Sequence, residues 1–395
     1  MQKFLILRFF SILCLMLIFV IVVLEVNAAA PKSDPIKVGV IVPLTGFAVE
    51  DGKQYSRSIN LAFEEMGWKI GDRKIELIIE DDAYNPTVAV QKIKKLFYSD
   101  KVKIVLGPQA TASALAIHPF IRDNKILTIV LMATTDQLNT GANFAKHWFR
   151  VSFCKQISNV AGYAAHKKGY GKAAIVIPDF VSGYDEAVGF TKVFEKVGGK
   201  VIQEIRVPLG SIDMAPYLMK IDANANVIYA FFFGEDAPRF IKQYVEYGLN
   251  KRIPLLAHGA TVDLPYLKAP GEAVLGAESV YFYCENLNIP EMVKFRKAFL
   301  DKYKLDVSYA AESGYMAAKV LILGLQAVKG DDENIDNLAA AIEKLDFKST
   351  RGRFRFGPEH NPIQDYYLRR VEKVEGRLEN VVKDVYPNIY QDWMP

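Results

Sequence analysis

Thr111 is the first residue whose type and position suggest ligand chemistry, because it follows a predicted strand and begins a predicted helix. Backbone N–H groups at a helix start are unsatisfied and favour negative charge. A hydroxyl beside them can donate to a ligand carboxylate. The alternative is that Thr111 serves only as an N-cap of the helix.

Two adjacent acids, Asp81 and Asp82, have the composition of a catalytic carboxylate pair. Neighbours on a strand point to opposite faces, so these two carboxyl groups cannot share one proton. We therefore expect N-capping and backbone hydrogen bonds from both. The five histidines show no metal-ligand spacing, and the chain has no nucleophile elbow, phosphate loop or dinucleotide-binding glycine motif. We expect no enzymatic activity, no metal and no cofactor.

The elements that position these residues alternate between strands and helices. Residues 36–42 are nearly all apolar, as in a strand covered on both faces, and Asn85-Pro86 begins a helix with Asn as its N-cap. This alternation predicts the α/β class, with a parallel sheet and helices on both faces. The expected strands are 36–42, 74–80, 102–106 and 126–130, and the expected helices are 52–67, 85–97 and 111–122.

The same alternation returns in a second unit over about 151–280, with no Gly/Ser linker at 148–154. A strand is therefore expected to run directly from one unit into the next. The expected strands are 173–177, 201–207, 227–233 and 253–257, with helices at 184–197, 214–221 and 237–247 and further helical patterns at 290–303 and 312–329.

The N-terminus has the pattern of an export signal. Lys3 and Arg8 precede the apolar run 9–24, and small residues at 26 and 28 follow it. This pattern predicts a signal peptide over residues 1–28, cleaved near Ala28. The run is short for a membrane span, which needs about 20 residues, and an uncleaved anchor is the alternative. With 49 basic and 45 acidic residues, the net charge of +4 gives no expectation of nucleic-acid binding.

Several short segments, taken in order and spacing, match a known family. They are Pro43-Leu44-Thr45-Gly46, Asp51-Gly52, Glu80-Asp81-Asp82 with Asn85-Pro86 and Ala89, Gly107-Pro108 with Thr111 and Ser113, Ala133-Thr134-Thr135, and Pro178-Asp179 with Ser182-Gly183. The chain resembles the leucine/isoleucine/valine-type periplasmic substrate-binding proteins of ABC transporters over nearly all of its mature length. The resemblance implies two Rossmann-like lobes with parallel sheets, joined by three crossover segments. Lobe 1 would comprise 36–149 plus 281–350, and lobe 2 would comprise 150–280 plus 351–395.

The resemblance also implies a cleft at the carboxyl ends of the strands and a set of ligand-binding residues. Thr111 and Thr134 match positions that bind the polar head of the ligand, and Ala133 offers a carbonyl. Asp51 would lie near the cleft mouth, with a solvated loop acid as its alternative. Phe233 matches an aromatic position that packs on the ligand, whereas Phe231 and Phe232 are expected in the core. Ser182 stands where a Tyr is common, and Tyr184 could swing in instead.

One departure from the family bears on the ligand. Family members that bind α-amino acids place an acid from lobe 2 on the ligand ammonium, but the segment 256–260 here has no acid before Asp263. Either Asp263 takes that role or the ligand lacks an ammonium, and His258 could then donate to a hydroxyl or carboxylate. His258 could equally be a surface-loop residue. The tail segments 353–356, 361–364 and 369–371 resemble the branch that includes binders of aromatic acids.

The resemblance further implies an exported, non-enzymatic protein of the periplasm or cell surface. It would capture a small carboxylate, either a branched-chain or other amino acid or an aromatic acid, by hinge closure and deliver it to an ABC transporter permease, and we expect a monomer. A membrane-anchored sensor of the same fold is the alternative. Cys154 and Cys284 fall near the expected crossovers, so they either form a disulfide across the hinge or remain two buried thiols.

Overall fold

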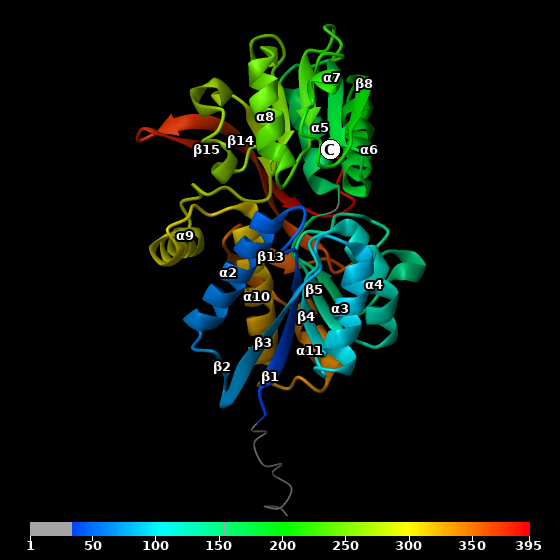
Figure 1. Cartoon of the computed structure of the whole chain (residues 1–395), viewed down its shortest axis with the longest axis vertical. Coiled ribbons are helices and arrows are strands. Elements are labelled where there is room, and N and C mark those ends of the chain that lie inside the picture. The colour runs from blue at the N-terminus through cyan, green and yellow to red at the C-terminus, as the bar shows by residue number, and fades with distance from the viewer. Residues whose placement is uncertain (1–33, 154) are drawn as a thin grey trace, which may run out of the picture.

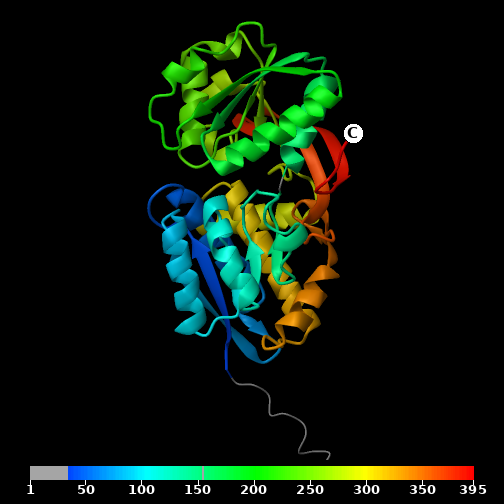
Figure 2. The same cartoon turned by 90° about the vertical axis from the view of Figure 1, so that its right-hand side faces the viewer.

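Two lobes are stacked along the long axis of the molecule (Figures 1 and 2). The computed structural model describes residues 34–153 and 155–395. The predicted signal peptide therefore lies outside the described residues, and so does Cys154 of the predicted disulfide. Among the described residues, no helix combines the length and the apolar content needed to cross a membrane.

The first lobe is built on a sheet with strand order β2-β3-β1-β4-β5-β6, in which only β2 runs antiparallel to its neighbour. Helices α3 and α4 lie on one side of this sheet, and α2 lies beside α10 (Figure 1). The elements are β1 (Ile36–Val42), α2 (Val49–Glu65), β2 (Lys69–Ile70), β3 (Arg73–Asp81), α3 (Pro86–Tyr98), β4 (Ile104–Leu106), α4 (Thr111–Asp123), β5 (Leu127–Val130), η1 (Gly141–Asn143), β6 (Trp148–Arg150), α9 (Pro290–Tyr303), α10 (Tyr309–Ala327) and α11 (Ile335–Glu343).

The second lobe has a parallel core in the order β8-β7-β9-β10-β11. Its elements are α5 (Gln156–Lys167), β7 (Lys172–Pro178), α6 (Val181–Lys196), β8 (Lys200–Val207), α7 (Ala215–Leu218), β9 (Val227–Ala230), α8 (Asp236–Glu246), η2 (Leu249–Lys251), β10 (Leu255–His258), η3 (Leu264–Tyr266), η4 (Gly271–Val274) and β11 (Glu278–Tyr281).

The C-terminal tail adds antiparallel strands that sequence reasoning missed. They are β12 (Asp346–Ser349), β13 (Gly352–Phe356), β14 (Pro362–Val374) and β15 (Arg377–Ile389). β14 pairs with β13 at one end and with β11 of the second lobe farther along, both antiparallel. The expectation of purely parallel sheets is therefore wrong for this sheet, and also for the first, where β2 is antiparallel. The alternation of apolar and polar residues that marks a half-buried strand is weak in β14, because this strand is buried on both faces for much of its length.

The chain passes between the lobes after β6, after β11 and at β14. We propose the lobe division 36–149 plus 281–350 and 150–280 plus 351–395 with one change. Residues 351–356 belong with lobe 1, because β13 pairs with β12 and Arg351 forms a buried ion pair with Glu312 of α10.

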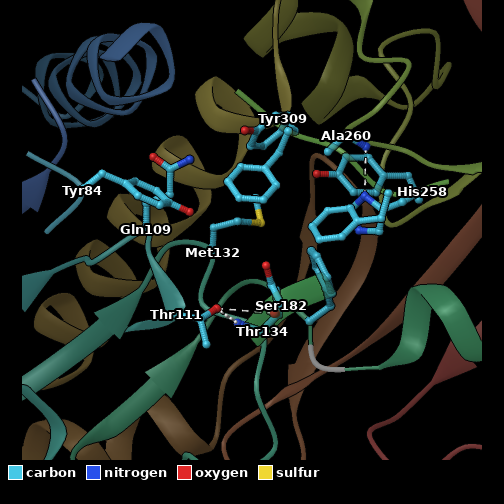
Figure 3. Close-up of a pocket in the computed structure, with 13 residues that line it drawn as sticks. Tyr84, Gln109, Thr111, Met132, Thr134, Ser182, His258, Ala260 and Tyr309 are labelled. Atoms are coloured by element: carbon cyan, nitrogen blue, oxygen red, sulfur yellow. Dashed lines mark hydrogen bonds between the residues drawn. The ribbon is translucent and has the colours of Figure 1, made fainter. Parts of the chain in front are cut away.

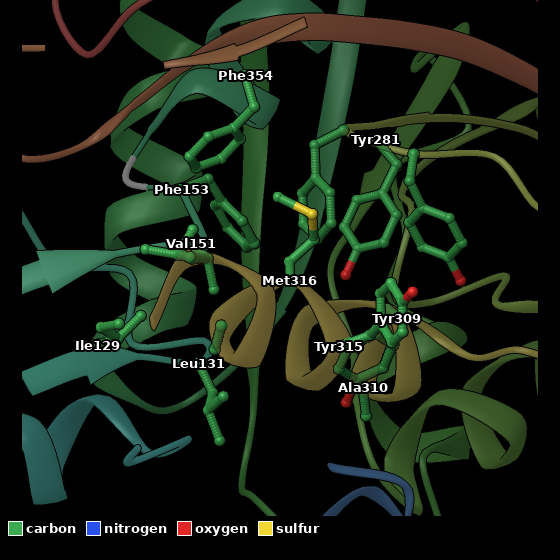
Figure 4. Close-up of a cluster of buried hydrophobic side chains, with 14 of the residues drawn as sticks. Ile129, Leu131, Val151, Phe153, Tyr281, Tyr309, Ala310, Tyr315, Met316 and Phe354 are labelled. Atoms are coloured by element: carbon green, nitrogen blue, oxygen red, sulfur yellow. The ribbon is translucent and has the colours of Figure 1, made fainter. Parts of the chain in front are cut away.

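The largest hydrophobic cluster runs without a break from the first lobe into the second. Figure 4 shows the part beneath the cleft, where Leu131 and Val151 approach Met316 of α10 and the rings of Phe153 and Tyr281. Burial of apolar surface contributes about 25 cal/mol per Å² to folding. A core shared in this way ties the position of each lobe to the other at the crossover segments.

The other elements follow the sequence pattern closely. Asn85 caps α3 as predicted, with its side chain accepting from the backbone N–H groups of Thr87 and Val88. β9 ends at Ala230, three residues earlier than the expected strand, which leaves Phe231 to Phe233 on the loop that follows. This shorter strand matters for the cleft, because Phe231 and Phe233 of the loop face it.

Candidate functional site

A cavity lies between the lobes, where the carboxyl ends of strands from both sheets meet (Figure 3). Its free volume is about 20 Å³, which is room for about one water molecule. Ligands of open α/β sheets bind at this edge. The lining residues are Tyr84, Gln109, Thr111, Met132, Thr134, Phe153, Ser182, Phe231, Phe233, His258, Ala260, Tyr281 and Tyr309.

On the lobe 1 side, two predicted hydroxyls lie next to each other. Thr111 is the first residue of α4, and its Oγ1 accepts from the backbone N–H of Thr134 at 3.2 Å and lies 3.5 Å from Thr134 Oγ1. The N-cap residue Ala110 has no side chain that could satisfy the first turn of α4. Gly107 makes this loop possible, because a Cβ there would lie 2.3 Å from the Ile41 carbonyl oxygen. The start of α4 therefore presents hydroxyl and N–H donors to the cavity.

On the lobe 2 side, a second helix begins at the cavity. Ser182 is the second residue of α6, and the N-cap Phe180 makes no side-chain cap hydrogen bond. Gly183 allows α6 to start close to β7, since a Cβ there would lie 2.2 Å from the Pro178 carbonyl oxygen. Tyr184 does not line the cavity. Its hydroxyl instead donates to Asp179, so it does not take the place of Ser182.

His258 is the last residue of β10 and is only 1% exposed, so the alternative of a surface-loop histidine is wrong. Its Nδ1 accepts from the Ala260 backbone N–H at 3.1 Å, which leaves the ring proton on Nε2. Burial, together with the charge of Arg369, lowers the pKa of His258 well below its ordinary value, so the ring is neutral. His258 therefore offers one N–H donor, from Nε2.

Aromatic rings form most of the remaining wall. Phe233 lies 6.1 Å from Tyr84 and 5.5 Å from Phe47 between ring centroids, so rings from the two lobes meet across the cleft. Phe231 stacks on Phe233 at 5.4 Å and belongs to the buried core as predicted, and it also lines the cavity. Phe232 packs in the lobe 2 core as predicted. Such a wall suits a planar apolar ligand body.

Asp51 does not line the cavity but supports it from behind. It lies in α2, is 3% exposed and accepts hydrogen bonds from Gln109, Tyr266 and Tyr309. The alternative of a solvated loop acid is therefore wrong. Burial raises the pKa of Asp51 to about 6. Because Tyr266 comes from lobe 2, this carboxyl group joins the two lobes and holds the Gln109 and Tyr309 side chains in place.

Ala133 also lies next to the cavity rather than in its wall, and its carbonyl accepts from Ser152 Oγ at 3.2 Å. Asp81 accepts from the backbone N–H groups of Leu44, Thr45 and Ala83, and Asp82 accepts from that of Tyr84. The predicted structural role of this acid pair is confirmed. Its hydrogen bonds position the loop that carries Tyr84 into the cavity.

No acidic or basic side chain is among the cavity-lining residues within the described part of the chain. Asp263 is fully buried behind the wall, where it accepts from the Tyr283 hydroxyl at 2.7 Å and the Tyr309 backbone N–H at 3.0 Å. Burial raises the pKa of Asp263 to about 7. It does not line the cavity, so of the two alternatives the one in which Asp263 replaces the acid of the amino-acid binders is wrong.

Five predicted site residues thus meet at the cavity, namely Thr111, Thr134, Ser182, Phe233 and His258. The sequence did not single out the aromatic and polar residues that complete the wall. Tyr84, Gln109 and Met132 each stand within two residues of a quoted motif, which was the available signal. Tyr281 ends β11 and Tyr309 begins α10, and neither carried such a signal.

Two further predictions concern the cysteines and metal ions rather than the cavity. Cys284 is buried and donates from Sγ to the Asn380 carbonyl oxygen at 3.0 Å, and burial raises its pKa. Its predicted pairing partner, Cys154, is outside the described residues, so the disulfide stays a prediction. Within 34–153 and 155–395, no group of three or more His, Cys, Asp or Glu side chains could hold a metal ion.

Comparison with known proteins gives one consistent result. Residues 35–376 match the family model described as "Periplasmic binding protein". The chain is 29% identical over 363 residues to Leu/Ile/Val-binding protein homolog 6 of Brucella melitensis, covering 89% of this chain and 92% of that protein.

Two solved structures are also similar along their length. A solute-binding protein of an ABC transporter from R. palustris, in complex with benzoate, is 31% identical with a TM-score of 0.84, covering 91% of this chain and 99% of the other. A solute-binding protein from Rhodopseudomonas palustris BisB5, in complex with 3,4-dihydroxybenzoic acid, is 30% identical with a TM-score of 0.87 and the same coverage.

Proposed function

We propose that this chain, which belongs to the periplasmic binding protein family, is the exported solute-binding component of an ABC importer and captures a small aromatic carboxylate. The N-terminal pattern supports export, and the similarity to solute-binding proteins of ABC transporters supports the importer role. The permease of that importer would be its protein partner. The chain itself carries out no chemical step.

The observation that carries the ligand class is a cavity lined by rings and hydroxyls with no acid among its described lining residues. An ammonium group buried there would have no compensating charge, which is strongly unfavourable in a closed cleft. An α-amino acid is therefore disfavoured. A benzoate-like acid has an apolar ring and a single charged group, and the bound ligands of the two similar structures are acids of this kind.

In the binding mode we propose, the carboxylate meets the Thr111 and Thr134 hydroxyls at the start of α4. Unsatisfied N–H groups and the helix dipole favour an anion at that position. The ligand ring would lie against Phe233 and the neighbouring rings. Met132 lies among these side chains (Figure 3), and its flexible thioether can move to make room for the ring.

Capture would work by hinge closure. The ligand touches residues of both lobes, so it binds the closed form better than the open form and shifts the population towards closure. Release to the permease requires the reverse movement. The protein would act as a monomer, because one chain supplies both walls of the cavity.

The proposal is tested by a thermal-shift screen of the exported protein after unfolding and refolding, which removes any carried-over ligand. A ligand at 100 times its Kd adds about 2.7 kcal/mol of stability. Benzoate or a hydroxybenzoate should raise the Tm by several degrees, whereas leucine and glutamate should not. A shift with leucine and none with any aromatic acid would contradict the ligand class.

A further inference from the structure

Two buried polar atoms at the lobe 2 end of the cavity have no hydrogen-bond partner among the described residues. They are Nε2 of His258 and the hydroxyl of Tyr281. The two side chains line the cavity, are 1% and 0% exposed, and lie 5.2 Å apart between ring centroids. Buried polar groups are nearly always hydrogen-bonded in native proteins. Two such atoms without a protein partner at a ligand cavity therefore indicate that the ligand supplies their hydrogen-bond partners.

The chemistry of each atom is set by its surroundings. His258 Nδ1 accepts from the Ala260 backbone N–H, so Nε2 carries the proton and donates (Figure 3). Tyr281 is a neutral phenol, because burial raises its pKa well above the ordinary value, and its hydroxyl can both donate and accept. A ligand hydroxyl has the matching chemistry, because it can accept from the imidazole N–H and exchange a hydrogen bond with the phenol.

A hydroxyl fits this pair better than a second carboxylate does. Arg369 lies beside Tyr281, with its guanidinium carbon 5.1 Å from the ring centroid. That guanidinium already donates to the Tyr283 and Gly259 carbonyl oxygens and lies 3.7 Å from Glu285. A second negative charge at this end would thus lack a free counter-charge.

These donors belong to lobe 2, whereas the hydroxyls proposed for the carboxylate belong to lobe 1. β10 and β11 are neighbouring parallel strands, and their ends carry His258 and Tyr281 to the same edge of the sheet. A ligand with oxygen at both ends would therefore bridge the cleft.

We propose that His258 and Tyr281 bind a ring hydroxyl of the ligand, so that the protein selects hydroxylated aromatic acids over unsubstituted ones. This inference rests on the proposed function and narrows the ligand class from aromatic acids to hydroxylated aromatic acids. The two side chains act as the specificity determinants of the site, while the carboxylate contacts at α4 are common to all aromatic acids.

Calorimetric titration of the refolded protein with benzoate, 3-hydroxybenzoate and 4-hydroxybenzoate tests the inference. At least one hydroxybenzoate should bind about tenfold more tightly than benzoate. Tyr281→Phe removes only the hydroxyl, and it should weaken binding of that hydroxybenzoate about tenfold more than it weakens binding of benzoate. His258→Phe should act in the same direction, and His258→Gln, which keeps an N–H donor, should recover part of the preference.

The matched control is Tyr244→Phe, because Tyr244 is also a buried lobe 2 tyrosine, its hydroxyl donates to the Ile253 carbonyl oxygen at 2.7 Å, and it does not line the cavity. It should leave the ratio of the two affinities unchanged. Equal binding of benzoate and both hydroxybenzoates, or an equal loss of both ligands in Tyr281→Phe, overturns the inference but leaves the proposed function intact. Failure of every aromatic acid to bind overturns both.

Discussion

At the scale of single residues, the cavity depends on hydroxyls whose hydrogen bonds are already partly fixed by the protein. Thr111 Oγ1 accepts from the Thr134 backbone N–H, so its own proton remains to be donated. Neither threonine carries charge, which lets the site bind an anion without an ion pair. Donors held in this way need little reorganisation when the ligand arrives.

Replacing Thr111 by Val should weaken binding of the aromatic acid about tenfold to a hundredfold, equivalent to about 1–3 kcal/mol. The substitution removes the donor to the carboxylate and the acceptor for the Thr134 N–H. Thr128→Val is the control, since Thr128 is a fully buried threonine of the same lobe outside the cavity. Calorimetry that gives equal affinities for Thr111→Val and the parent protein would refute the carboxylate assignment.

At the scale of elements, the site depends on two helices that begin at the cleft. α4 carries Thr111 and α6 carries Ser182, and neither N-cap residue satisfies its helix with a side chain. The position of α6 is fixed in part by Glu186, which is buried and accepts from the Tyr229 hydroxyl of β9 at 2.9 Å. Burial raises the pKa of Glu186 to about 8, so this contact is made by a carboxyl group that keeps its proton near neutral pH.

This raised pKa predicts a pH dependence of stability. The folded state binds the Glu186 proton more tightly than the unfolded chain does, so the stabilisation is complete below about pH 4.5 and is lost as the pH rises through about 8. Glu186→Gln keeps a neutral acceptor for Tyr229 at every pH. Relative to Glu186→Gln, the parent protein should lose about 2–4 kcal/mol between pH 5 and pH 9.

Urea unfolding of both proteins at the two pH values provides the measurement. Taking the difference between them cancels the contributions of other buried acids, such as Asp51 and Asp263, whose pKa values are also raised. A difference that stays constant from pH 5 to pH 9 would show that Glu186 is ionised throughout.

At the scale of the whole molecule, one buried arginine contacts all three segments that join the lobes. The Arg351 guanidinium donates to the Val151 carbonyl after β6, lies 4.0 Å from the Phe282 ring centroid after β11, and donates to Gln364 of β14 at 3.2 Å. It also pairs with Glu312 of α10 at 2.6 Å, with both side chains fully buried. This arrangement supports the hinge in which the lobes would move.

Arg351→Met should lower the free energy of unfolding by about 3–5 kcal/mol, because it leaves Glu312 buried without a partner. Arg353→Met is a close control, since Arg353 lies two residues farther along the chain, in β13, but pairs with Asp346 at an exposed position. The control should lose less than about 1 kcal/mol. Chemical denaturation that shows equal losses would remove Arg351 from its central place in the hinge.

The sequence by itself determined the class of fold, most elements and the family. These follow from local patterns: apolar strands, the Asn85 cap, and loop motifs in which Gly107 and Gly183 are required by close backbone approach. The same patterns placed Thr111, Thr134 and Ser182 at strand ends, where the cavity lies. They did not reveal the antiparallel tail, in which β12, β13, β14 and β15 pair consecutively and β14 also joins β11 of the second lobe.

Only the tertiary structure decided what surrounds the ligand. Tyr281 reaches the cavity at the end of β11, where the chain leaves lobe 2, and Tyr309 reaches it from the start of α10, and no spacing along the sequence encodes that meeting. Asp51 and Asp263 read alike in the sequence as available acids, yet both are buried and bonded to tyrosine hydroxyls behind the wall. Charge and hydrogen-bonding capacity in a cavity depend on which groups are already paired, and that is a property of contacts between segments distant in the chain.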